Sequence, residues 1–150
     1  MNLQHNWWVV TDLDGTLMDD NYDVSPAIDT FSWLKKIRIP IIPCTSKTAA
    51  EVKVFRNEFG LCDPYIVENG GAIYGDNPHE SSSWELALGR THDELRPLLD
   101  RLSNSLGYQL RALKDISESE IETLTGLKGK AIKLACKREW SVPFLNPPST

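Results

Sequence analysis

Short apolar runs alternate with helix-like segments over the first half of the chain, and this alternation constrains the fold more than any other feature. The runs are residues 7–13 (WWVVTDL), 39–44 (IPIIPC) and 65–68 (YIVE). Each is short and rich in strand-forming residues, which is typical of strands buried in a parallel sheet. The order strand, helix, strand, helix, strand predicts an α/β fold with a doubly wound, Rossmann-like parallel sheet and right-handed crossovers.

The segments between these runs carry the local signals of two helices. Ser25 and Pro26 suit a helix start, with serine as the cap and proline at the first helical position. Residues 45–48 open a second helix, which Gly60 ends. After the third run, residues 69–71 (NGG) predict a turn from which the chain returns as a β-hairpin.

The pattern changes near residue 78, where a polar stretch over 77–83 is interpreted as a linker. We therefore expect one domain over residues 1–78 and part of a second, α+β domain over residues 79–150. The elements expected there are a helix behind a capping box at Thr91 and Glu94, a helix behind a box at Ser117 and Glu120, a helix over 128–137 and a short strand over 141–145.

Charge and composition exclude several classes of partner. The net charge of −5 and the pI near 5.2 leave no basic surface for nucleic-acid phosphates. No stretch approaches the ~18 apolar residues of a membrane span, and no signal peptide is recognisable. The three cysteines show no CxxC spacing and are expected to be reduced thiols. We expect a cytoplasmic protein that binds neither nucleic acid nor membranes.

The acidic motif DLDGT, residues 12–16, directly follows the first apolar run. Carboxylates at positions i and i+2 of a strand point the same way, so Asp12 and Asp14 converge on one ligand. Asp12 then suits a nucleophile that attacks phosphorus, and Asp14 suits a proton donor to the leaving oxygen. Magnesium would offset the repulsion between carboxylate and phosphate. The alternative is a polar turn after a strand, where Asp and Gly are common.

The other two runs also end in polar residues, and in parallel sheets ligands bind at this end of the strands. Thr45 and Ser46 follow the second run, where hydroxyl and backbone N–H groups at a helix start bind phosphate. Lys47 either adds positive charge there or is solvated. Residues 68–71 follow the third run and either line the same cleft or form only a hairpin turn.

Three segments resemble the haloacid dehalogenase-like phosphatases: VVTDLDGTL, IIPCTSKTAAEV and YIVENGGAIY. Within them the chain is most similar to the mannosyl-3-phosphoglycerate phosphatase family, whose members typically show DLDGTLL, SSKT, ENG and a later REYSEPF-like segment. The corresponding residues here are TSKT at 45–48, ENGG at 68–71, TGL at 125–127 and REWSVPF at 138–144. The resemblance covers nearly all 150 residues and implies an α/β phosphatase core over 1–78 with part of an α+β cap over 79–150.

The resemblance also implies roles for individual residues. Asp12 is expected to be the nucleophile and Asp14 the general acid and base, with Mg²⁺ bound by Asp12 and the Asp14 backbone carbonyl. The residues expected to bind phosphate or substrate are Thr45, with Ser46 as the alternative hydroxyl, Lys47, Asn69, Gly70, and the cap residues Arg138 and Ser141 near the glycerate end. The implied partner is a small phosphorylated sugar or glycerate, and the oligomeric state is left open.

Departures from the family pattern leave alternatives. Val142 stands where the family has an acidic residue. Two further family motifs, a phosphate-binding lysine and an acidic GDxxND-type loop, are not found, and Lys128, Lys130 and Lys133 lie in the expected cap. We therefore expect these 150 residues to be a fragment of a longer phosphatase. The alternatives are another sugar-phosphate phosphatase, a phosphomutase of the same superfamily, or a non-catalytic sugar-phosphate-binding remnant.

Overall fold

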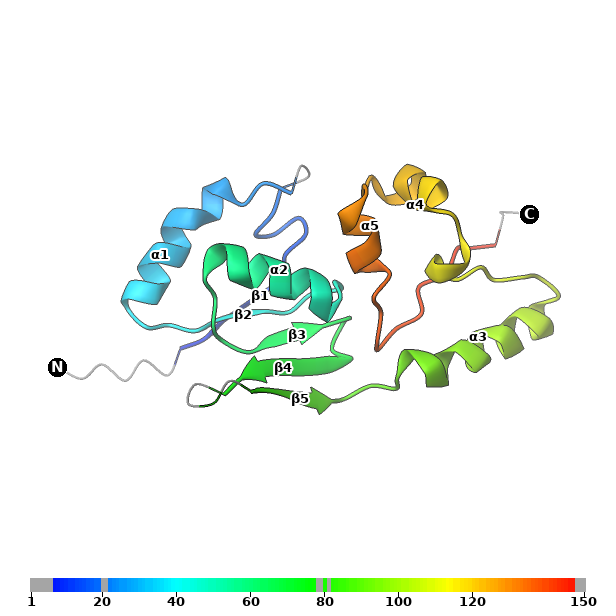
Figure 1. Cartoon of the computed structure of the whole chain (residues 1–150), viewed down its shortest axis with the longest axis horizontal. Coiled ribbons are helices and arrows are strands. Elements are labelled where there is room, and N and C mark those ends of the chain that lie inside the picture. Colours follow the sequence, from blue (N-terminus) through cyan, green and yellow to red (C-terminus); the bar gives the residue numbers. More distant parts are fainter. Residues whose placement is uncertain (1–6, 20–21, 78–79, 81, 148–150) are drawn as a thin grey trace.

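The part of the chain that the structure describes forms five strands and five α-helices, arranged as in Figure 1. The computed structural model of the chain describes residues 7–19, 22–77, 80 and 82–147. Short 3-10 helices occupy Ser25–Ala27 and Leu113–Asp115. In chain order the other elements are β1 (Val9–Thr11), α1 (Ile28–Lys36), β2 (Ile41–Pro43), α2 (Ala49–Phe59), β3 (Tyr65–Val67), β4 (Ala72–Asp76), β5 (Ser83–Ala87), α3 (His92–Leu106), α4 (Glu118–Thr125) and α5 (Lys130–Ala135).

The strands combine a parallel part and an antiparallel part. β1 and β2 pair in parallel, with Val9 opposite Ile41. A single parallel bridge between Cys44 and Ile66 joins the end of β2 to β3. β3, β4 and β5 then form an antiparallel meander whose first turn is the expected NGG turn. The predicted α/β class, the parallel pairing and the hairpin are confirmed.

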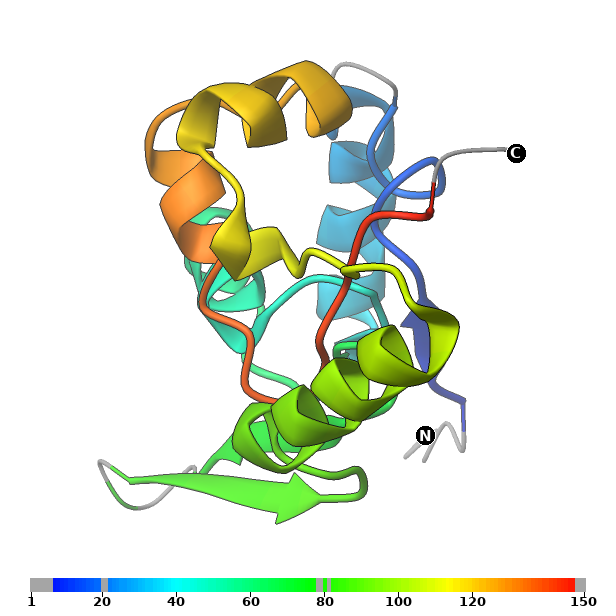
Figure 2. The ribbon, with the colours of Figure 1, turned by 90° about the vertical axis from the view of Figure 1, so that its right-hand side faces the viewer.

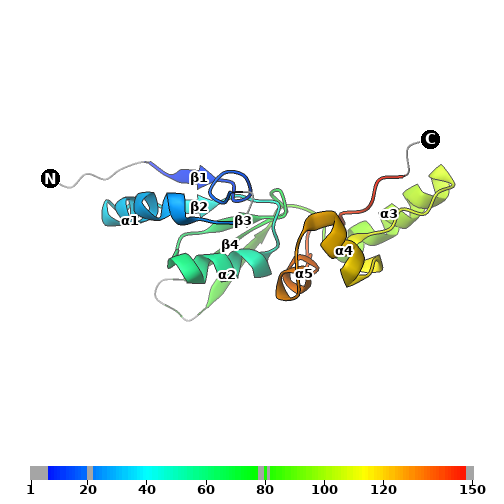
Figure 3. The ribbon, with the colours of Figure 1, turned by 90° about the horizontal axis from the view of Figure 1, so that it is seen from above.

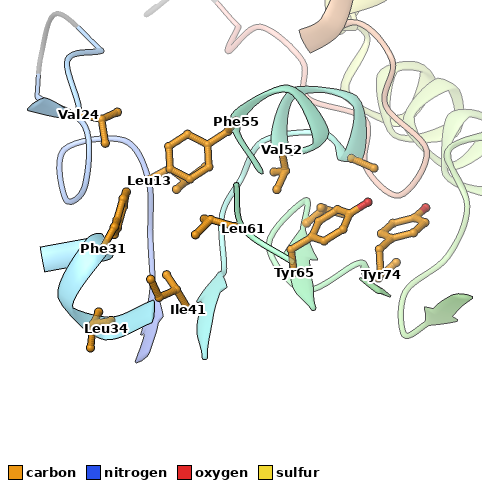
Figure 4. Close-up of a cluster of buried hydrophobic side chains, with 13 residues drawn as sticks. Leu13, Val24, Phe31, Leu34, Ile41, Val52, Phe55, Leu61, Tyr65 and Tyr74 are labelled. Atoms are coloured by element: carbon orange, nitrogen blue, oxygen red, sulfur yellow. The ribbon is translucent and has the colours of Figure 1, made fainter. Parts of the chain in front are cut away.

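Helices α1 and α2 lie side by side on one face of these strands. The Phe31 ring of α1 packs edge-on against Phe55 and Phe59 of α2, with ring centroids 6.4 and 5.9 Å apart. Figure 4 shows Phe31 and Phe55 on one side of the cluster and the stacked Tyr65 and Tyr74 on the other, with Val52 and Leu61 between them. The buried cluster consists of Leu13, Val24, Phe31, Leu34, Ile41, Ala49, Val52, Phe55, Leu61, Tyr65, Val67, Ala72 and Tyr74.

The helix ends follow the local signals, with one correction. α2 begins with Thr48 as its cap and Glu51 as the partner of a capping box, and it ends at Gly60, whose φ is +58°. The prediction that Ser25 caps the first helix is wrong. Asp23 accepts hydrogen bonds from both the backbone N–H and the hydroxyl of Ser25, and a 3-10 turn precedes α1. Ser25 is thus a hydrogen-bond donor to the Asp23 carboxylate and not the acceptor that caps the helix.

β1 is more exposed than the sequence predicts. The apolar run was expected to be a buried strand, but Val10 is 54% exposed, and Trp7 and Trp8 are each 71% exposed. Within the part of the chain that the structure describes, β1 pairs with β2 along one edge and has no strand on the other. The prediction of burial is therefore wrong for β1, because burial depends on neighbours and not on the run itself.

The second half contains helices and very little strand. α3 begins at the predicted Thr91–Glu94 capping box. Ser117 caps α4 as expected, but the Glu120 carboxylate pairs with Arg111 and does not complete the box. The predicted strand over 141–145 is wrong, because only an isolated bridge between Ala112 and Phe144 forms there.

The expected linker lies between two strands that pair with each other, with Asp76 opposite Ser83. β5 pairs along the whole length of β4, so strand pairing places residues 83–87 with the other strands. Strands β1 to β5 together are hereafter called the first sheet. The predicted boundary at residues 78–79 lies outside the described residues, and the division into two domains stays a prediction. None of the described helices is long and apolar enough to cross a membrane.

Figures 1 and 2 show α3 lying apart from α4 and α5. After α5 the chain runs to the first sheet and turns there. It then runs back between α3 on one side and α4 and α5 on the other. Viewed from above, the sheet with α1 and α2 occupies one end of the molecule, and α3, α4 and α5 occupy the other (Figure 3). The turn is formed by residues 138–141, hereafter the return segment, which brings the second half back to the first sheet.

Candidate active site

Backbone hydrogen bonds bring the carboxyl ends of β1, β2 and β3 together at one edge. Cys44 N–H donates to the Thr11 carbonyl at 2.8 Å, and Thr45 N–H donates to the Ile66 carbonyl at 3.1 Å. Asn69 N–H in turn donates to the Thr45 carbonyl at 3.0 Å. The residues that directly follow the three strands therefore belong to adjacent loops, as the parallel topology predicts.

The loop after β1 presents its two carboxylates to solvent. Leu13 is fully buried, and its carbonyl accepts the N–H groups of residues 16, 17 and 18. Gly15 has a φ of +67°, a conformation that glycine adopts without steric cost. Because Leu13 points into the core, Asp12 and Asp14 on either side of it point outward and are exposed.

Lys47 faces the acidic loop from the neighbouring strand end. Its amino group lies 2.9 Å from Asp14 Oδ1 and 4.0 Å from Glu51 Oε1, and 5.1 Å from the centre of the Tyr22 ring. Its side chain is only 13% exposed. A cation shielded from water in this way attracts an anion more strongly than a solvated one. Lys47 is thus a largely buried, ion-paired cation and not a solvated one, and its binding of phosphate stays a prediction.

The hydroxyls after β2 differ in accessibility. Thr45 is buried, and its hydroxyl accepts the Lys47 N–H at 3.3 Å, whereas Ser46 is exposed. The capping box of α2 engages the N–H groups of Thr48 and Glu51. Two of the N–H groups at the start of this helix are thus satisfied within the protein.

The predicted residues of the second half reach the same edge. Arg138 Nη1 donates to the Ser46 carbonyl at 2.7 Å and to the Ser141 hydroxyl at 3.3 Å. Arg138 and Ser46 are 92 residues apart in the chain. Asn69 is exposed in the turn after β3, and Gly70 follows it with a φ of +90°.

Glu68 has a partner that sequence reasoning did not find. The side chain is 3% exposed, and its carboxylate accepts the N–H groups of Glu139 and Trp140 at 2.9 and 3.1 Å and the hydroxyl of Ser141. The sequence placed Glu68 beside the cleft as part of a turn. No local pattern could pair it with a segment more than 70 residues further on.

Two buried tyrosines lie beneath the return segment. The Tyr74 hydroxyl donates to Glu139 Oε2 and accepts the Trp140 indole N–H, each at 2.9 Å. Burial raises the pKa of Tyr74 and that of Tyr65 above the usual range. The Tyr74 phenol is protonated at neutral pH, as its hydrogen bond to Glu139 requires.

The acidic loop fits one side of a magnesium site. Mg²⁺ prefers carboxylate and carbonyl oxygens in octahedral geometry and keeps several waters. The exposed Asp12 carboxylate and the Asp14 backbone carbonyl are donors of this type. Among residues 7–19, 22–77, 80 and 82–147 no cluster of three or more His, Cys, Asp or Glu residues is placed to hold a metal ion.

Comparison with known proteins gives the class to which this fold and site belong. Residues 9–103 match the family described as haloacid dehalogenase-like hydrolase, so the chain belongs to this family. The predicted resemblance to this family is confirmed.

Two curated relatives carry a more particular name, glucosyl-3-phosphoglycerate/mannosyl-3-phosphoglycerate phosphatase. They come from Persephonella marina and Methanococcoides burtonii. Each is 33% identical to this chain over 147 residues, which cover 91% of this chain and 54% of the relative. The chain thus spans about half the length of the curated relatives that it matches.

Solved structures share the fold at low identity. A protein of Thermoplasma acidophilum matches with a TM-score of 0.64 and 17% identity, over 95% of this chain and 52% of its own. A haloacid dehalogenase-like hydrolase from Bacteroides thetaiotaomicron matches with a TM-score of 0.53 and 19% identity, over 71% of this chain and 39% of its own. These similarities show the fold alone.

Proposed function

We propose that this chain carries the nucleophile side of a magnesium-dependent phosphate-monoester hydrolase. The observation that supports it best is the pair of exposed carboxylates, Asp12 and Asp14, at the end of β1, with the Lys47 amino group 2.9 Å from Asp14. Opposite charges thus face each other across the edge where the three strands end. Such an edge suits a substrate that is anionic and is attacked by a carboxylate.

The proposed reaction has two steps. An oxygen of the Asp12 carboxylate forms a bond to phosphorus while the bond from phosphorus to the substrate oxygen breaks, and Asp14 gives that oxygen a proton. Asp14 then takes a proton from water, whose oxygen attacks the aspartyl-phosphate and releases phosphate. Lys47 and a hydroxyl of the β2 loop, Thr45 or the more exposed Ser46, bind the phosphoryl oxygens.

Magnesium has a limited part in this proposal. Bound by the Asp12 carboxylate and the Asp14 carbonyl, the ion would offset the repulsion between the attacking carboxylate and the phosphate. The described residues supply only these donors, and water would fill the remaining positions of the octahedron.

The proposed substrate is a sugar linked to 3-phosphoglycerate. The name of the two curated relatives supports this class. The position of Arg138 and Ser141 beside the β2 loop also supports it, because a guanidinium suits a glycerate carboxylate and Asn69 faces the same edge. Val142 stands where the family has an acidic residue. Comparing phosphate release from the glucosyl and the mannosyl substrate measures which sugar is preferred.

Trapping of a phosphoryl mimic tests the nucleophile without requiring turnover. The chain, with Mg²⁺ and beryllium fluoride, is expected to form an Asp12 adduct that gives a bound signal in ¹⁹F NMR. Asp12→Asn should lose this signal and keep its circular dichroism spectrum. Asp29→Asn, which removes an exposed carboxylate from the first turn of α1, should keep the signal. An adduct that persists in Asp12→Asn contradicts the mechanism.

Phosphate release tests the substrate class. Mannosyl- and glucosyl-3-phosphoglycerate should be hydrolysed faster than hexose phosphates, and Asp12→Asn should reduce turnover by about 10³-fold or more. Trapping without any release would identify a phosphate-binding chain that does not turn over. Release that is equally fast from hexose phosphates would favour a broader sugar phosphatase.

A further inference from the structure

We propose that Glu68 is a positioning residue, which sets the phosphate-binding loop 45–47 through Ser141 and Arg138 of the return segment. This inference rests on the proposed function. It goes beyond it by assigning a role to a residue that touches neither the acidic loop nor the proposed substrate.

The surroundings of Glu68 are built to hold a carboxylate. A buried carboxylate is costly unless hydrogen-bond donors surround it, and Glu68 receives three from the return segment. Its own backbone is in the left-handed region with a φ of +49°, and Asn69 follows with +60°. Side-chain-bearing residues adopt this conformation at a cost, and it persists where surrounding contacts enforce it.

A continuous series of hydrogen bonds leads from Glu68 to the β2 loop. The Ser141 hydroxyl donates to Glu68 and accepts from Arg138 Nη1 at 3.3 Å. The same Nη1 donates to the Ser46 carbonyl at 2.7 Å. The backbone N–H of Glu68 also donates to the Lys47 carbonyl at 3.0 Å, a contact that does not depend on the side chain.

The hydrogen bond from Arg138 to the Ser46 carbonyl fixes the peptide plane between Ser46 and Lys47. The carbonyl and the N–H of a trans peptide point in opposite directions, so holding one orients the other. Arg138 holds the Ser46 carbonyl, and the Lys47 N–H donates to the Thr45 hydroxyl at 3.3 Å. The orientation of the Thr45 hydroxyl, proposed to bind phosphate, thus depends on Arg138 and through it on Glu68.

The return segment also packs closely against the β3–β4 turn. A Cβ placed on Gly71 would lie 2.4 Å from Trp140 Cβ, and the Trp140 indole donates to the Tyr74 hydroxyl. A purely structural role for Glu68 would hold this segment in place without affecting phosphate. The two roles are separated by measuring docking and phosphate binding in the same variants.

The test uses the full chain with Glu68→Gln, which keeps the shape of the side chain but faces an N–H donor with an amide NH₂ group. Glu68→Asp is the second variant, because it keeps the charge and tolerates the left-handed backbone better. Glu139→Gln is the matched control: it removes one negative charge from the return segment and keeps the backbone N–H that binds Glu68. Amide hydrogen exchange at residues 139 and 140 reports docking, and ³¹P NMR titration with inorganic phosphate and Mg²⁺ reports the site.

In both Glu68 variants, exchange at residues 139 and 140 is expected to rise by about tenfold or more, and phosphate binding to weaken by about tenfold. Removing a negative charge by itself should strengthen phosphate binding, so weakening in Glu68→Gln has the opposite sign to a simple charge effect. Glu139→Gln should not weaken phosphate binding.

Three results would contradict the positioning role of Glu68 or the proposed function, and each is distinguishable from the others. Unchanged exchange in both Glu68 variants shows that Glu68 does not hold the return segment. Faster exchange with unchanged phosphate binding leaves only a structural role and rules out positioning. Wild-type chain that binds no phosphate contradicts the proposed function before any variant is made, and the positioning role is then rejected with it.

Discussion

The two halves of the molecule bury their apolar residues very differently. In the first sheet with α1 and α2, thirteen buried hydrophobic residues form a single cluster. In the described part of the second half, the buried hydrophobic residues other than Ala135 form two separate groups, Leu99 with Leu110 and Ala112, and Ile116 with Ile121 and Ile132. Hydrophobic burial is the main stabilising contribution in folding, so most of the stability belongs to the first half.

In the second half, α3 nevertheless has local signals as complete as those of α2 in the first half. α3 has a full capping box and ends at Gly107, whose φ is +63°. Along its length only Leu99 is buried, whereas Leu102 and Leu106 are 45% and 56% exposed. Helices of this length are marginal in water without tertiary packing. Local signals place a helix, but the area that it buries determines how stable it is.

Removal of a core ring should give the largest effect. Phe55→Ala deletes a side chain that is 4% exposed and packs against Phe31, and should lower the free energy of unfolding by about 3–5 kcal/mol. Ile121→Ala in the second half should speed hydrogen exchange in α4 and α5 and leave the main urea transition in place. If Ile121→Ala shifts that transition as much as Phe55→Ala does, the halves unfold as one unit.

Two glycines of the first sheet test how the halves are joined. An added Cβ at Gly71 would lie 2.4 Å from Trp140 Cβ, an atom next to the backbone, so Gly71→Ala should displace the return segment at a cost of about 1–3 kcal/mol. At Gly75 it would meet the ring of Trp84, 37% exposed, at 2.3 Å, and this ring can swing into solvent. Gly75→Ala should therefore be tolerated. Thermal unfolding and the indole NMR signal of Trp140 distinguish the two variants.

Alkaline pH should lower the free energy of unfolding through Tyr74, which binds the return segment, and this is the smallest of the expected effects. Burial raises the pKa of Tyr74, whereas a tyrosine in the unfolded chain titrates near ~10. Above that pH the unfolded chain has lost a proton that the folded chain keeps, so the free energy of unfolding falls as pH rises. Tyr74→Phe should make this decline shallower. Urea unfolding between pH 7 and 11 measures the slope, and equal slopes in both proteins would contradict the prediction.

Much of the fold could be predicted because its signals are local. Thr48 and Thr91 each start a helix with a glutamate three residues on, and residues 69–71 form the turn of a hairpin. The exposure of Asp12 and Asp14 follows from their alternation with the buried Leu13. In each case the residues that decide the outcome lie within a few positions of one another.

The rest depended on neighbours that are distant in the chain. The sequence by itself determined the order of the elements up to the β3–β4 hairpin, the starts of α2, α3 and α4, and the acidic loop, because hydrogen bonds within one turn and alternation along one strand fix these. Only the tertiary structure decided that β1 is exposed, that Lys47 faces Asp14, and that Glu68 binds the return segment. Such contacts form where packing brings separate elements together, and their energies depend on burial that no single segment specifies.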